Sequence, residues 1–443
     1  MDARNTRTAW GPMSSAFAIC LALLFALAAI GAPIALAMIV AAAAYLAVKG
    51  QDLGLVSEQI VQGLYDSFIL LAVPLFIVAA NIMNAGTISD RLLRFCVALV
   101  GRFRGGLGYV NVVASLIFSG MSGSAIADAA GIGKIVIEMM TKNGRYTPGF
   151  AAAITAASAT IGPIIPPSIP MVMYALVSDA SIGYLFLGGV IPGLLMAFAL
   201  MAMIFFLART RGFATEEPVP LSALPRVTVS AFPALMLPVI LLFGIYGGAT
   251  TPTEAAAVAA AYALLLAAFF YRAISWRALY AILSESARSS AAVGLIIGAA
   301  LVMNYIVAAE NIPGVVAGAL RHVELTPVVF LVAVNILLLA LGCILDATTI
   351  ILIVVPLFIP ACRELGIDLV HFGVVVVVNA MIGLITPPYG VLLFVINATT
   401  GIPMRAMIRE VVPFLAVLLV ALLIMVLVPD VVLWLPRRFG YNG

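Results

Sequence analysis

The chain has 443 residues, of which 64% are hydrophobic and only 9% are charged, and its mean hydropathy is +1.22. Most of such a chain cannot face water, which excludes a set of soluble domains and indicates a polytopic membrane protein. The net charge of +3 is too small and too scattered to indicate a nucleic-acid partner.

Apolar stretches long enough to cross a hydrocarbon layer of about 30 Å recur along the whole chain. In chain order they occupy residues 14–48, 66–85, 110–141, 148–177, 184–207, 227–246, 254–271, 289–308, 328–362, 370–398 and 411–436. The first contains Gly31-Ala-Pro33 and is expected to form two short helices, with one long kinked helix as the alternative. The longest polar connection, 208–226, contains three prolines and lies at the midpoint. We therefore expect an all-α membrane protein in two halves, 1–207 and 227–443, joined by this linker.

The two halves share an ordered set of interruptions. In the first half, the small and polar residues of 119–128 are followed by a glycine and a proline pair in 162–167. In the second half, 342–349 is followed by the same types of residue in 383–388, about 220 residues after the first set. Interruptions at corresponding places in two halves of a membrane protein are typical of a transporter binding site.

Basic residues indicate how the halves are oriented. Residues 86–148 carry seven Lys and Arg, whereas 309–372 carry two. Because cytoplasmic loops are enriched in Lys and Arg, segment 110–141 is expected to begin and end on the cytoplasmic side, and segment 328–362 on the periplasmic side. This opposite orientation predicts an inverted repeat.

Each of these two interrupted segments is too long for one straight crossing and too short for two. We therefore predict two re-entrant helical hairpins, 110–141 and 328–362, that reach the middle of the membrane and turn back. Serines and glycines form the first tip at 119–124, and Asp346, Thr348 and Thr349 belong to the second. Lipid offers no hydrogen-bond partner to the backbone of a turn, so both tips must face a cavity.

Two further membrane helices are expected to be broken by adjacent prolines, at 166–167 and at 387–388. A break frees carbonyl oxygens, which together with the hydroxyls of the hairpin tips are ligands suited to a hard cation such as sodium. The alternative is that each proline pair only kinks its helix. The candidate ligands are the carbonyls of Gly162 and Ile165 with the hydroxyls of 122–124, and in the second half Gly383, Thr386 and the second tip.

Asp128 and Asp346 lie in apolar surroundings, where an ionised carboxylate is costly and usually functional. Two interpretations of Asp128 remain open: it binds a cation, or it caps the second helix of the first hairpin by accepting backbone N–H groups. For Asp346 we favour a role in ion binding or in the tip itself, because its neighbours are apolar or hydroxylic.

No catalytic or cofactor motif is evident. The chain has two histidines and four cysteines, and it lacks a CxxC pair, a histidine-rich metal motif, a plausible Ser–His pair and a cofactor fingerprint. We therefore expect neither enzyme activity nor a bound cofactor. A passive membrane subunit is also disfavoured, because it would have little use for two polar hairpin tips at mid-depth.

Four stretches together resemble the large membrane subunit of tripartite ATP-independent periplasmic (TRAP) transporters. They are 122–128 (SGSAIAD), 162–168 (GPIIPPS), 244–255 (GIYGGATTPTEA) and 383–390 (GLITPPYG). The resemblance covers essentially the whole chain, and the combination is specific although each stretch alone is weak. It implies an elevator-type, sodium-coupled secondary transporter in a bacterial inner membrane, which takes up an organic acid such as a C4-dicarboxylate or sialic acid.

The resemblance also implies which residues bind the ions and the substrate. One sodium ion is expected at Ser119, Ser122, Ser124, Gly162, Ile165 and Pro167. A second is expected at Gly342, Asp346, Thr348, Thr349, Gly383, Thr386 and Pro388. The substrate is expected between the tips, in contact with Ser124, Ser168, Thr349 and Tyr389. Neither tip nor break contains a basic residue, so helix N-termini and bound sodium are expected to offset part of the charge of an anionic substrate.

Two partners besides membrane lipid are implied, a small four-helix membrane subunit and a periplasmic substrate-binding protein that does most of the substrate selection. The hairpins and broken helices are expected to form a mobile transport unit, and 227–271 with arms near 86–105 and 310–327 is expected to form the scaffold. The alternative is a sodium–dicarboxylate symporter of the same broad architecture that works without a binding protein.

Overall fold

The computed structural model describes residues 14–84, 87–213, 220–321, 326–343 and 345–443. Within these ranges the chain consists of helices joined by turns, without an extended strand, so the all-α fold class is confirmed. The helices of the first half are α1 (Ser15–Ala29), α2 (Ile34–Lys49), α3 (Gly54–Asp66), η1 (Phe68–Leu71), α4 (Ala72–Asn84), α5 (Thr87–Val100), α6 (Gly106–Ser122), α7 (Ala125–Asp128), η2 (Ala129–Gly133), α8 (Lys134–Thr141), η3 (Lys142–Gly144), α9 (Pro148–Ala159), α10 (Ile169–Ser178) and α11 (Ile182–Arg211). Those of the second half are η4 (Leu221–Ala223), α12 (Leu224–Tyr246), α13 (Pro252–Leu265), η5 (Leu266–Phe270), α14 (Trp276–Ala309), α15 (Ile312–Arg321), α16 (Pro327–Gly342), α17 (Ala347–Thr349), η6 (Ile350–Val354), η7 (Val355–Leu357), α18 (Ile359–Glu364), α19 (Leu369–Gly383), α20 (Val391–Thr400), α21 (Met404–Leu427) and α22 (Asp430–Arg438).

Five of the described helices are long and apolar enough to cross a membrane: α11, α12, α13 with η5, α14 and α21. Together, α3, η1 and α4 form a sixth candidate that is bent by 72°. Large apolar side chains on these helices point outward, among them Phe198 on α11 and Phe243 on α12, which are 67% and 78% exposed. Apolar side chains exposed in such numbers are typical of a surface that faces lipid.

The first apolar stretch forms two helices, as predicted. Helix α1 ends at Ala29, the chain turns at Gly31 with a φ of +82°, and Pro33 directly precedes α2. Proline suits this position because its fixed φ is compatible with a helix start and its missing N–H is not needed there.

Two predicted helix boundaries are wrong. Helix α14 begins at Trp276 rather than at residue 289, because Ser275 caps it by accepting the N–H of Ala278 at 3.2 Å and the polar side chains of its first turns do not interrupt it. The predicted segment 411–436 is two helices, since α21 ends at Leu427, just before Pro429, and α22 follows.

A π turn follows each hairpin tip. In the first hairpin, η2 separates the short helix α7 from α8, and in the second, η6 directly follows α17. Single π turns of this kind widen a helix by one residue and are frequent near functional sites.

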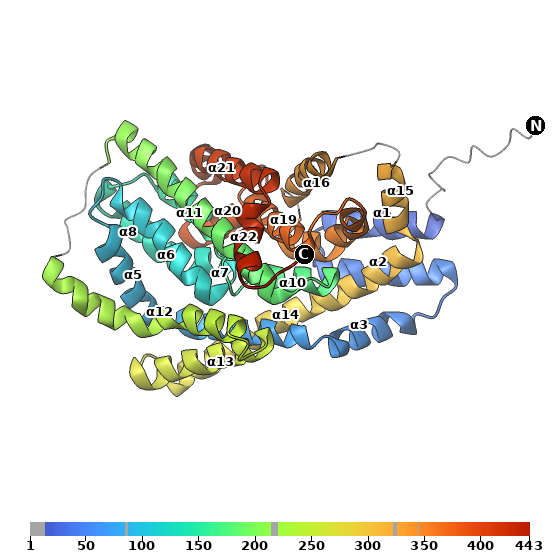
Figure 1. The fold of residues 1–443 in the computed structure, drawn as a ribbon, viewed down its shortest axis with the longest axis horizontal. Helices are drawn as coiled ribbons and strands as arrows, with labels where there is room; N and C mark the ends of the chain where they lie inside the picture. Colours follow the sequence, from blue (N-terminus) through green and yellow to red (C-terminus); the bar gives the residue numbers. More distant parts are fainter. Residues whose placement is uncertain (1–13, 85–86, 214–219, 322–325, 344) are drawn as a thin grey trace, which may run out of the picture.

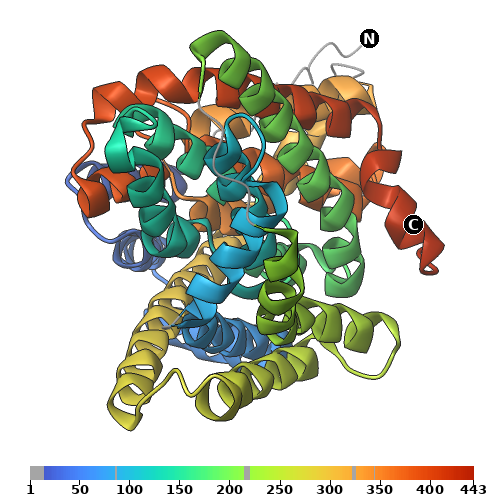
Figure 2. The same ribbon diagram turned by 90° about the vertical axis from the view of Figure 1, so that its left-hand side faces the viewer.

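The helices pack in two groups (Figure 1). The first group, here called the frame, consists of α1 to α4 and α12 to α14; in it α14 contacts α2, α3 and α4, and α13 lies against α4. The second, here called the core group, consists of α6 to α11 and α16 to α22; in it α21 lies on α9 and α16 on α19. Figure 2 shows α13 and the lower part of α14 below the core group, and α1 and α2 at its left side. Two helices connect them, because α5 contacts both α6 and α12, and α15 contacts both α14 and α18.

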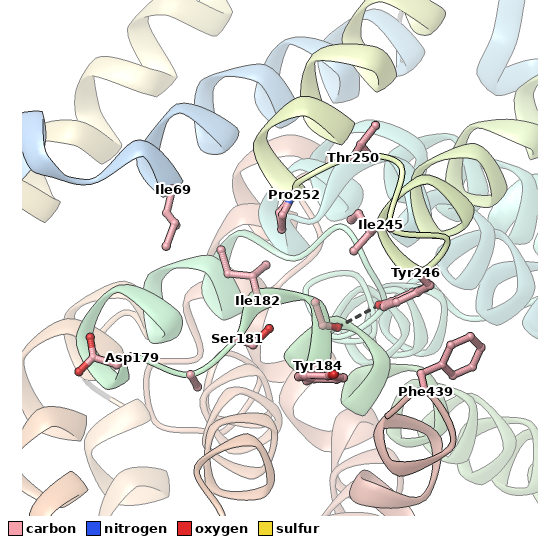
Figure 3. A pocket seen from close by; sticks show the side chains of 13 residues that line it. Ile69, Asp179, Ser181, Ile182, Tyr184, Ile245, Tyr246, Thr250, Pro252 and Phe439 are labelled. Atoms are coloured by element: carbon pink, nitrogen blue, oxygen red, sulfur yellow. Dashed lines mark hydrogen bonds between the residues drawn. The ribbon is translucent and has the colours of Figure 1, made fainter. Parts of the chain in front are cut away.

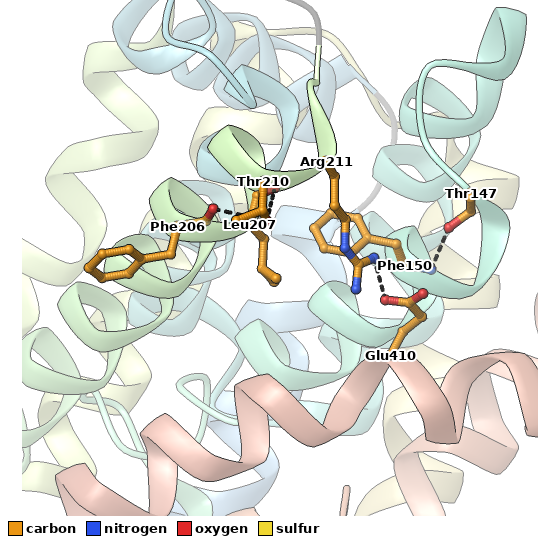
Figure 4. Close-up of polar contacts among 7 residues, drawn as sticks. All are labelled: Thr147, Phe150, Phe206, Leu207, Thr210, Arg211 and Glu410. Atoms are coloured by element: carbon orange, nitrogen blue, oxygen red, sulfur yellow. Dashed lines mark hydrogen bonds and ion pairs between the residues drawn. The ribbon is translucent and has the colours of Figure 1, made fainter.

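An ion pair joins the two halves of the chain within the core group (Figure 4). Arg211, at the end of α11, donates to Glu410 of α21 at 2.6 Å, and its guanidinium lies 5.4 Å from the ring centre of Phe150 on α9. Helix α11 thus extends into the predicted linker 208–226, of which residues 214–219 lie outside the described ranges.

A second ion pair lies in the frame. Lys49, at the end of α2, is 2.8 Å from Glu310, the residue that follows α14, and the hydroxyl of Tyr45 donates to the same carboxylate at 2.7 Å. The hydrogen bond from Lys49, followed by that from Tyr45, lowers the pKa of Glu310 to about 2.

Candidate functional site

The first hairpin tip lies against the first proline break. Helix α6 ends at Ser122, Gly123 adopts a φ of +59°, and Ser124 caps α7 by accepting the N–H of Ala127. Gly123 is so close to the carbonyl oxygen of Pro167 that a β-carbon there would clash with it. Only glycine combines this backbone conformation with this contact.

Asp128 is the most unusual polar residue at this junction. Its side chain is 4% exposed, and its Oδ1 accepts a hydrogen bond of 2.5 Å from the Ser122 hydroxyl. Its Oδ2 is buried and has no hydrogen-bond partner within the described part of the chain. A β-carbon added to Gly162 would lie 2.5 Å from that oxygen, so Gly162 leaves the room in which Oδ2 sits. An orphaned buried carboxylate oxygen needs a proton or a cation.

The capping interpretation of Asp128 is therefore wrong. Ser124 occupies the N-cap position of the second hairpin helix, and Asp128 lies at the end of α7, one turn further along the helix. The structure thus places the Asp128 carboxylate beside Ser122 and Gly162, two of the residues that the sequence predicted for the first ion. The signal was present in the sequence as an acidic residue in an apolar stretch.

The other residues predicted for the first ion are placed less favourably. The Ser119 hydroxyl is fully buried and donates to the carbonyl of Leu116 in its own helix at 2.5 Å. Ile165 packs its side chain against Gly193 of α11. Ser168 is also fully buried, where it donates to the carbonyl of Pro163 and caps α10, and this arrangement does not favour its predicted contact with substrate.

The second hairpin tip also lies against a broken helix, but different residues form the contact and the helix cap. Gly342 at the end of α16 lies against Gly383 of α19, and an added β-carbon on Gly383 would lie 2.9 Å from the Cα atom of Gly342. Asp346 caps α17, accepting the N–H of Thr349 at 3.1 Å and its hydroxyl at 2.5 Å. The hydroxyl of Thr386 donates to the carbonyl of Ile382 at 2.8 Å.

The remaining predicted residues of the second site differ in exposure. Thr348 is half-buried, whereas Thr349 is 3% exposed. Pro388 and Tyr389 are exposed, and the Tyr389 ring lies 6.5 Å from that of Phe394. The structure therefore brings Gly342 and Gly383 together and pairs Asp346 with Thr349, but it places Tyr389 on the surface of the chain.

Buried hydrogen bonds attach each hairpin to its broken helix below the tip. In the first half, Asn111 and Ser115 of α6 bond to Thr155 and Ser158 of α9 at 2.6 to 2.9 Å. In the second half, the Asn379 amide of α19 donates to the carbonyl and the side-chain oxygen of Asn335 of α16, both at 2.8 Å. Ser158 and Asn379 lie at corresponding places in the two halves, 221 residues apart. The sequence did not predict their partners on the hairpins.

A cavity of about 550 Å³ lies between the frame and the core group (Figure 3). The described residues that line it do not belong to either tip. The frame contributes Ile69, the end of α12 and the turn before α13, and the core group contributes residues 179–184 and Phe439. The hydroxyl of Tyr246 crosses from the frame to the carbonyl of Gly183 at 3.1 Å. This hydrogen bond joins the two groups at the cavity.

The architecture is that of a polytopic membrane transport protein. Its fold is similar to that of the YdaH transporter of Alcanivorax borkumensis, with a TM-score of 0.59 over 84% of this chain and 86% of that one, at 15% sequence identity. The family model described as "Tripartite ATP-independent periplasmic transporter, DctM component" matches residues 21–431. The chain belongs to this family, as its resemblance to TRAP large subunits predicted.

Relatives with known names agree with this assignment. The chain is 40% identical to the sialic acid TRAP transporter large permease protein SiaM of Vibrio cholerae, covering 95% of this chain and 98% of that protein. It is also 40% identical to the C4-dicarboxylate large permease protein DctM of Pseudomonas aeruginosa, over 85% and 88%. The isethionate permease protein DctMQ of Oleidesulfovibrio alaskensis is longer, since a match of 38% identity covers 91% of this chain but 63% of that protein. The protein is thus a multi-pass permease component of the bacterial inner membrane.

Proposed function

We propose that this permease imports a small organic anion together with sodium, as the membrane component of a binding-protein-dependent transporter. The observation that carries the proposal is the buried, unpartnered Oδ2 of Asp128, which lies beside Gly162 and belongs to the carboxylate that Ser122 contacts. A sodium ion at this place would satisfy an oxygen that otherwise bears an uncompensated charge.

The first ion site in this proposal consists of Asp128, the Ser122 hydroxyl and backbone oxygens of the proline break, with Ser119, Ser124, Ile165 and Pro167 as further candidates. Oxygen ligands from a carboxylate, a hydroxyl and peptide carbonyls are the set that a hard cation prefers. Because these oxygens come from both the hairpin and the broken helix, an ion there would hold the two elements together.

The second ion site is proposed where Gly342 meets Gly383. The two helices touch there without intervening side chains, and the carbonyl oxygen of Gly342 lies at the contact. Asp346, Thr348, Thr349, Thr386 and Pro388 are the further candidates around it. The Asp346 carboxylate already accepts two hydrogen bonds from Thr349, so its share in binding the ion is smaller than that of Asp128.

The substrate is proposed to be a carboxylate-bearing organic acid of the type named in the relatives, sialic acid or a C4-dicarboxylate. Ser124, half-buried at the N-terminus of α7, is the best-placed contact among the predicted ones. Free N–H groups at this helix start and the bound cations would offset part of the anion's charge. Thr349 and Tyr389 are the candidates in the second half.

The proposed partners follow from the family description, and the proposed motion follows from the packing of the helices. The family description is of a tripartite, periplasmic transporter, which supports a binding protein and a small membrane subunit as partners. The division into frame and core group supports an elevator motion, in which the core group moves against the frame. The first tip lies directly at that boundary, because a β-carbon on Gly120 would be 2.8 Å from Pro238 of α12.

Sodium-dependent stabilisation of the purified permease tests the ion site without substrate or partners. We expect the midpoint of thermal unfolding to rise in sodium chloride relative to choline chloride, since an ion at 100 times its Kd stabilises by about 2.7 kcal/mol. Asp128→Asn should lose most of this rise. The matched control is Glu138→Gln, which removes an exposed carboxylate from the same hairpin and should keep the full response.

Uptake by proteoliposomes that contain all three components then tests the coupling. An imposed sodium gradient should drive uptake of the substrate by the wild type and by Glu138→Gln, but not by Asp128→Asn. A full sodium response of Asp128→Asn in both assays would remove the basis of the proposal.

A further inference from the structure

Three arginines surround a cavity that the transport site does not use. This cavity has a volume of about 660 Å³ and lies between α5 and the start of α12. Its lining consists of Asp90, Arg91, Arg94, Arg226, Val227 and Ser230. It is therefore lined by three positive charges and one negative charge, and each helix contributes at least one arginine.

One of the arginines is held in place by two contacts, and a third contact joins its two partners to each other. Arg91 donates to the Ser230 hydroxyl at 2.8 Å, and its guanidinium lies 4.7 Å from the ring centre of Tyr271. The Tyr271 hydroxyl in turn donates to the carbonyl of Ser230 at 2.9 Å. These contacts leave Arg91 half-buried at the wall of the cavity with a fixed orientation. A pre-positioned guanidinium loses little entropy when it binds an anion.

The other two arginines are exposed and have no ion-pair partner among the described residues. Arg94 and Arg226 line the cavity from opposite helices. Asp90, one turn before Arg94 on α5, also lies without an ion pair to either of them in the described structure. Unpaired like charges around one cavity repel each other, and an anion with several oxygens removes that repulsion.

The surroundings indicate where the anion comes from. Next to the cavity, α12 exposes Val229 and Phe232, which are 72% and 52% exposed, and η5 exposes Phe269 and Phe270, which are 73% and 63% exposed. These side chains belong to the lipid-facing surface of the frame. Residues 86–148, which include α5, also carry most of the basic residues of the first half that mark the cytoplasmic side. A headgroup in the cavity would therefore have acyl chains along the apolar surface beside it.

We propose that this cavity binds the phosphodiester headgroup of an anionic phospholipid, which fastens α5 to α12. Arginine suits the site because its planar donors match phosphate oxygens in pairs, and basic pockets on the cytoplasmic side of membrane proteins bind such headgroups. A lipid bound there would also affect the structure, since α5 is one of the two helices that connect the frame to the core group. The lipid would anchor that connection on the frame side.

Native mass spectrometry of the detergent-purified permease tests the proposal. We expect phosphatidylglycerol to bind with saturation, and phosphatidylcholine with the same acyl chains to bind much more weakly. Each arginine near a membrane surface contributes about 1 kcal/mol, which corresponds to roughly a fivefold change in affinity. Arg94→Gln with Arg226→Gln should therefore weaken binding of phosphatidylglycerol by roughly 30-fold. The same pair of substitutions should abolish the rise in unfolding temperature that phosphatidylglycerol causes in the wild type.

The matched control is Arg102→Gln with Arg209→Gln, which removes two charges outside the cavity and should keep wild-type binding. Equal binding by the cavity variant and the control variant would overturn the proposal. Saturable binding of inorganic phosphate that displaces phosphatidylglycerol would identify a site for free anions and would also overturn it.

Discussion

Replacing Gly383 by alanine tests whether the second hairpin and its broken helix must touch through their backbones. The added β-carbon would lie 2.9 Å from Cα, 3.1 Å from the carbonyl carbon and 3.2 Å from the carbonyl oxygen of Gly342. Ordinary carbon–carbon contacts are about 3.5 to 4.0 Å, so α16 and α19 must separate by roughly 0.6 to 1.1 Å. No flexible side chain can absorb this shift, because the obstructing atoms are backbone.

Two effects of Gly383→Ala follow from the separation. Overpacking of a well-packed contact costs about 1 to 3 kcal/mol, which should lower the midpoint of thermal unfolding. Ligand distances in metal sites are held to about 0.2 Å, so a shift several times larger should weaken sodium binding at the proposed second site. We expect the sodium concentration for half-maximal uptake to rise about 10- to 100-fold.

Thermal unfolding of the purified permease and sodium-dependent uptake by reconstituted transporter measure the two effects separately. Gly294→Ala is the control, because its β-carbon would meet no atom within 4 Å and the position is helical. It should leave uptake unchanged and stabilise slightly. Wild-type unfolding together with wild-type sodium dependence in Gly383→Ala would refute the reasoning about this contact.

Three further predictions concern polar contacts away from the tips. Asn379→Leu leaves the side-chain oxygen of Asn335 without its donor and should destabilise the permease by about 1 kcal/mol. The double variant with Asn335→Leu should recover part of the lost stability, which thermal unfolding measures. Arg211→Gln and Glu410→Gln should show a coupling of about 0.2 to 1 kcal/mol in a double-mutant cycle that shrinks in high salt; no coupling at low salt would contradict the ion pair. Because Glu310 has a pKa lowered to about 2, its ion pair stabilises above about pH 4.5, the ordinary value, and this contribution is lost as the pH falls toward 2. The difference in unfolding temperature between wild type and Glu310→Gln should therefore be constant near neutral pH and vanish at the acid end, and a difference that grew on acidification would contradict the prediction.

The features that could be predicted were those that depend on residues close together in the sequence or on composition. A proline pair in an apolar stretch breaks a helix whatever surrounds it, and the chain leaves helical geometry at both pairs. A glycine and a proline at Gly31 and Pro33 likewise separate α1 from α2. The all-α class followed from composition alone, because a membrane offers few other solutions to a chain this apolar.

Contacts between distant segments were the ones that could not be predicted. Whether Asp128 caps the second hairpin helix depended on where that helix starts, and the structure has Ser124 as the cap, next to Gly123, which lies against Pro167. The pairing of Arg211 with Glu410 joins residues 199 positions apart, and no local pattern reports it. The start of α14 was missed because polar residues in its first turns end an apolar stretch without ending a helix.

The π turns after the two tips set the direction in which each tip points. A helix of 3.6 residues per turn rotates by about 100° for each residue, so the extra residue in η2 turns the tip with Asp128 by that angle relative to the stem α8. Removal of one residue, for example Gly131, would restore a regular helix and redirect the carboxylate away from Gly162 while leaving the stem in place. The same holds for η6 and Thr349. In both halves, therefore, the direction of the tip depends on chain length and not only on side-chain identity, so evolution can change it through a single-codon insertion or deletion.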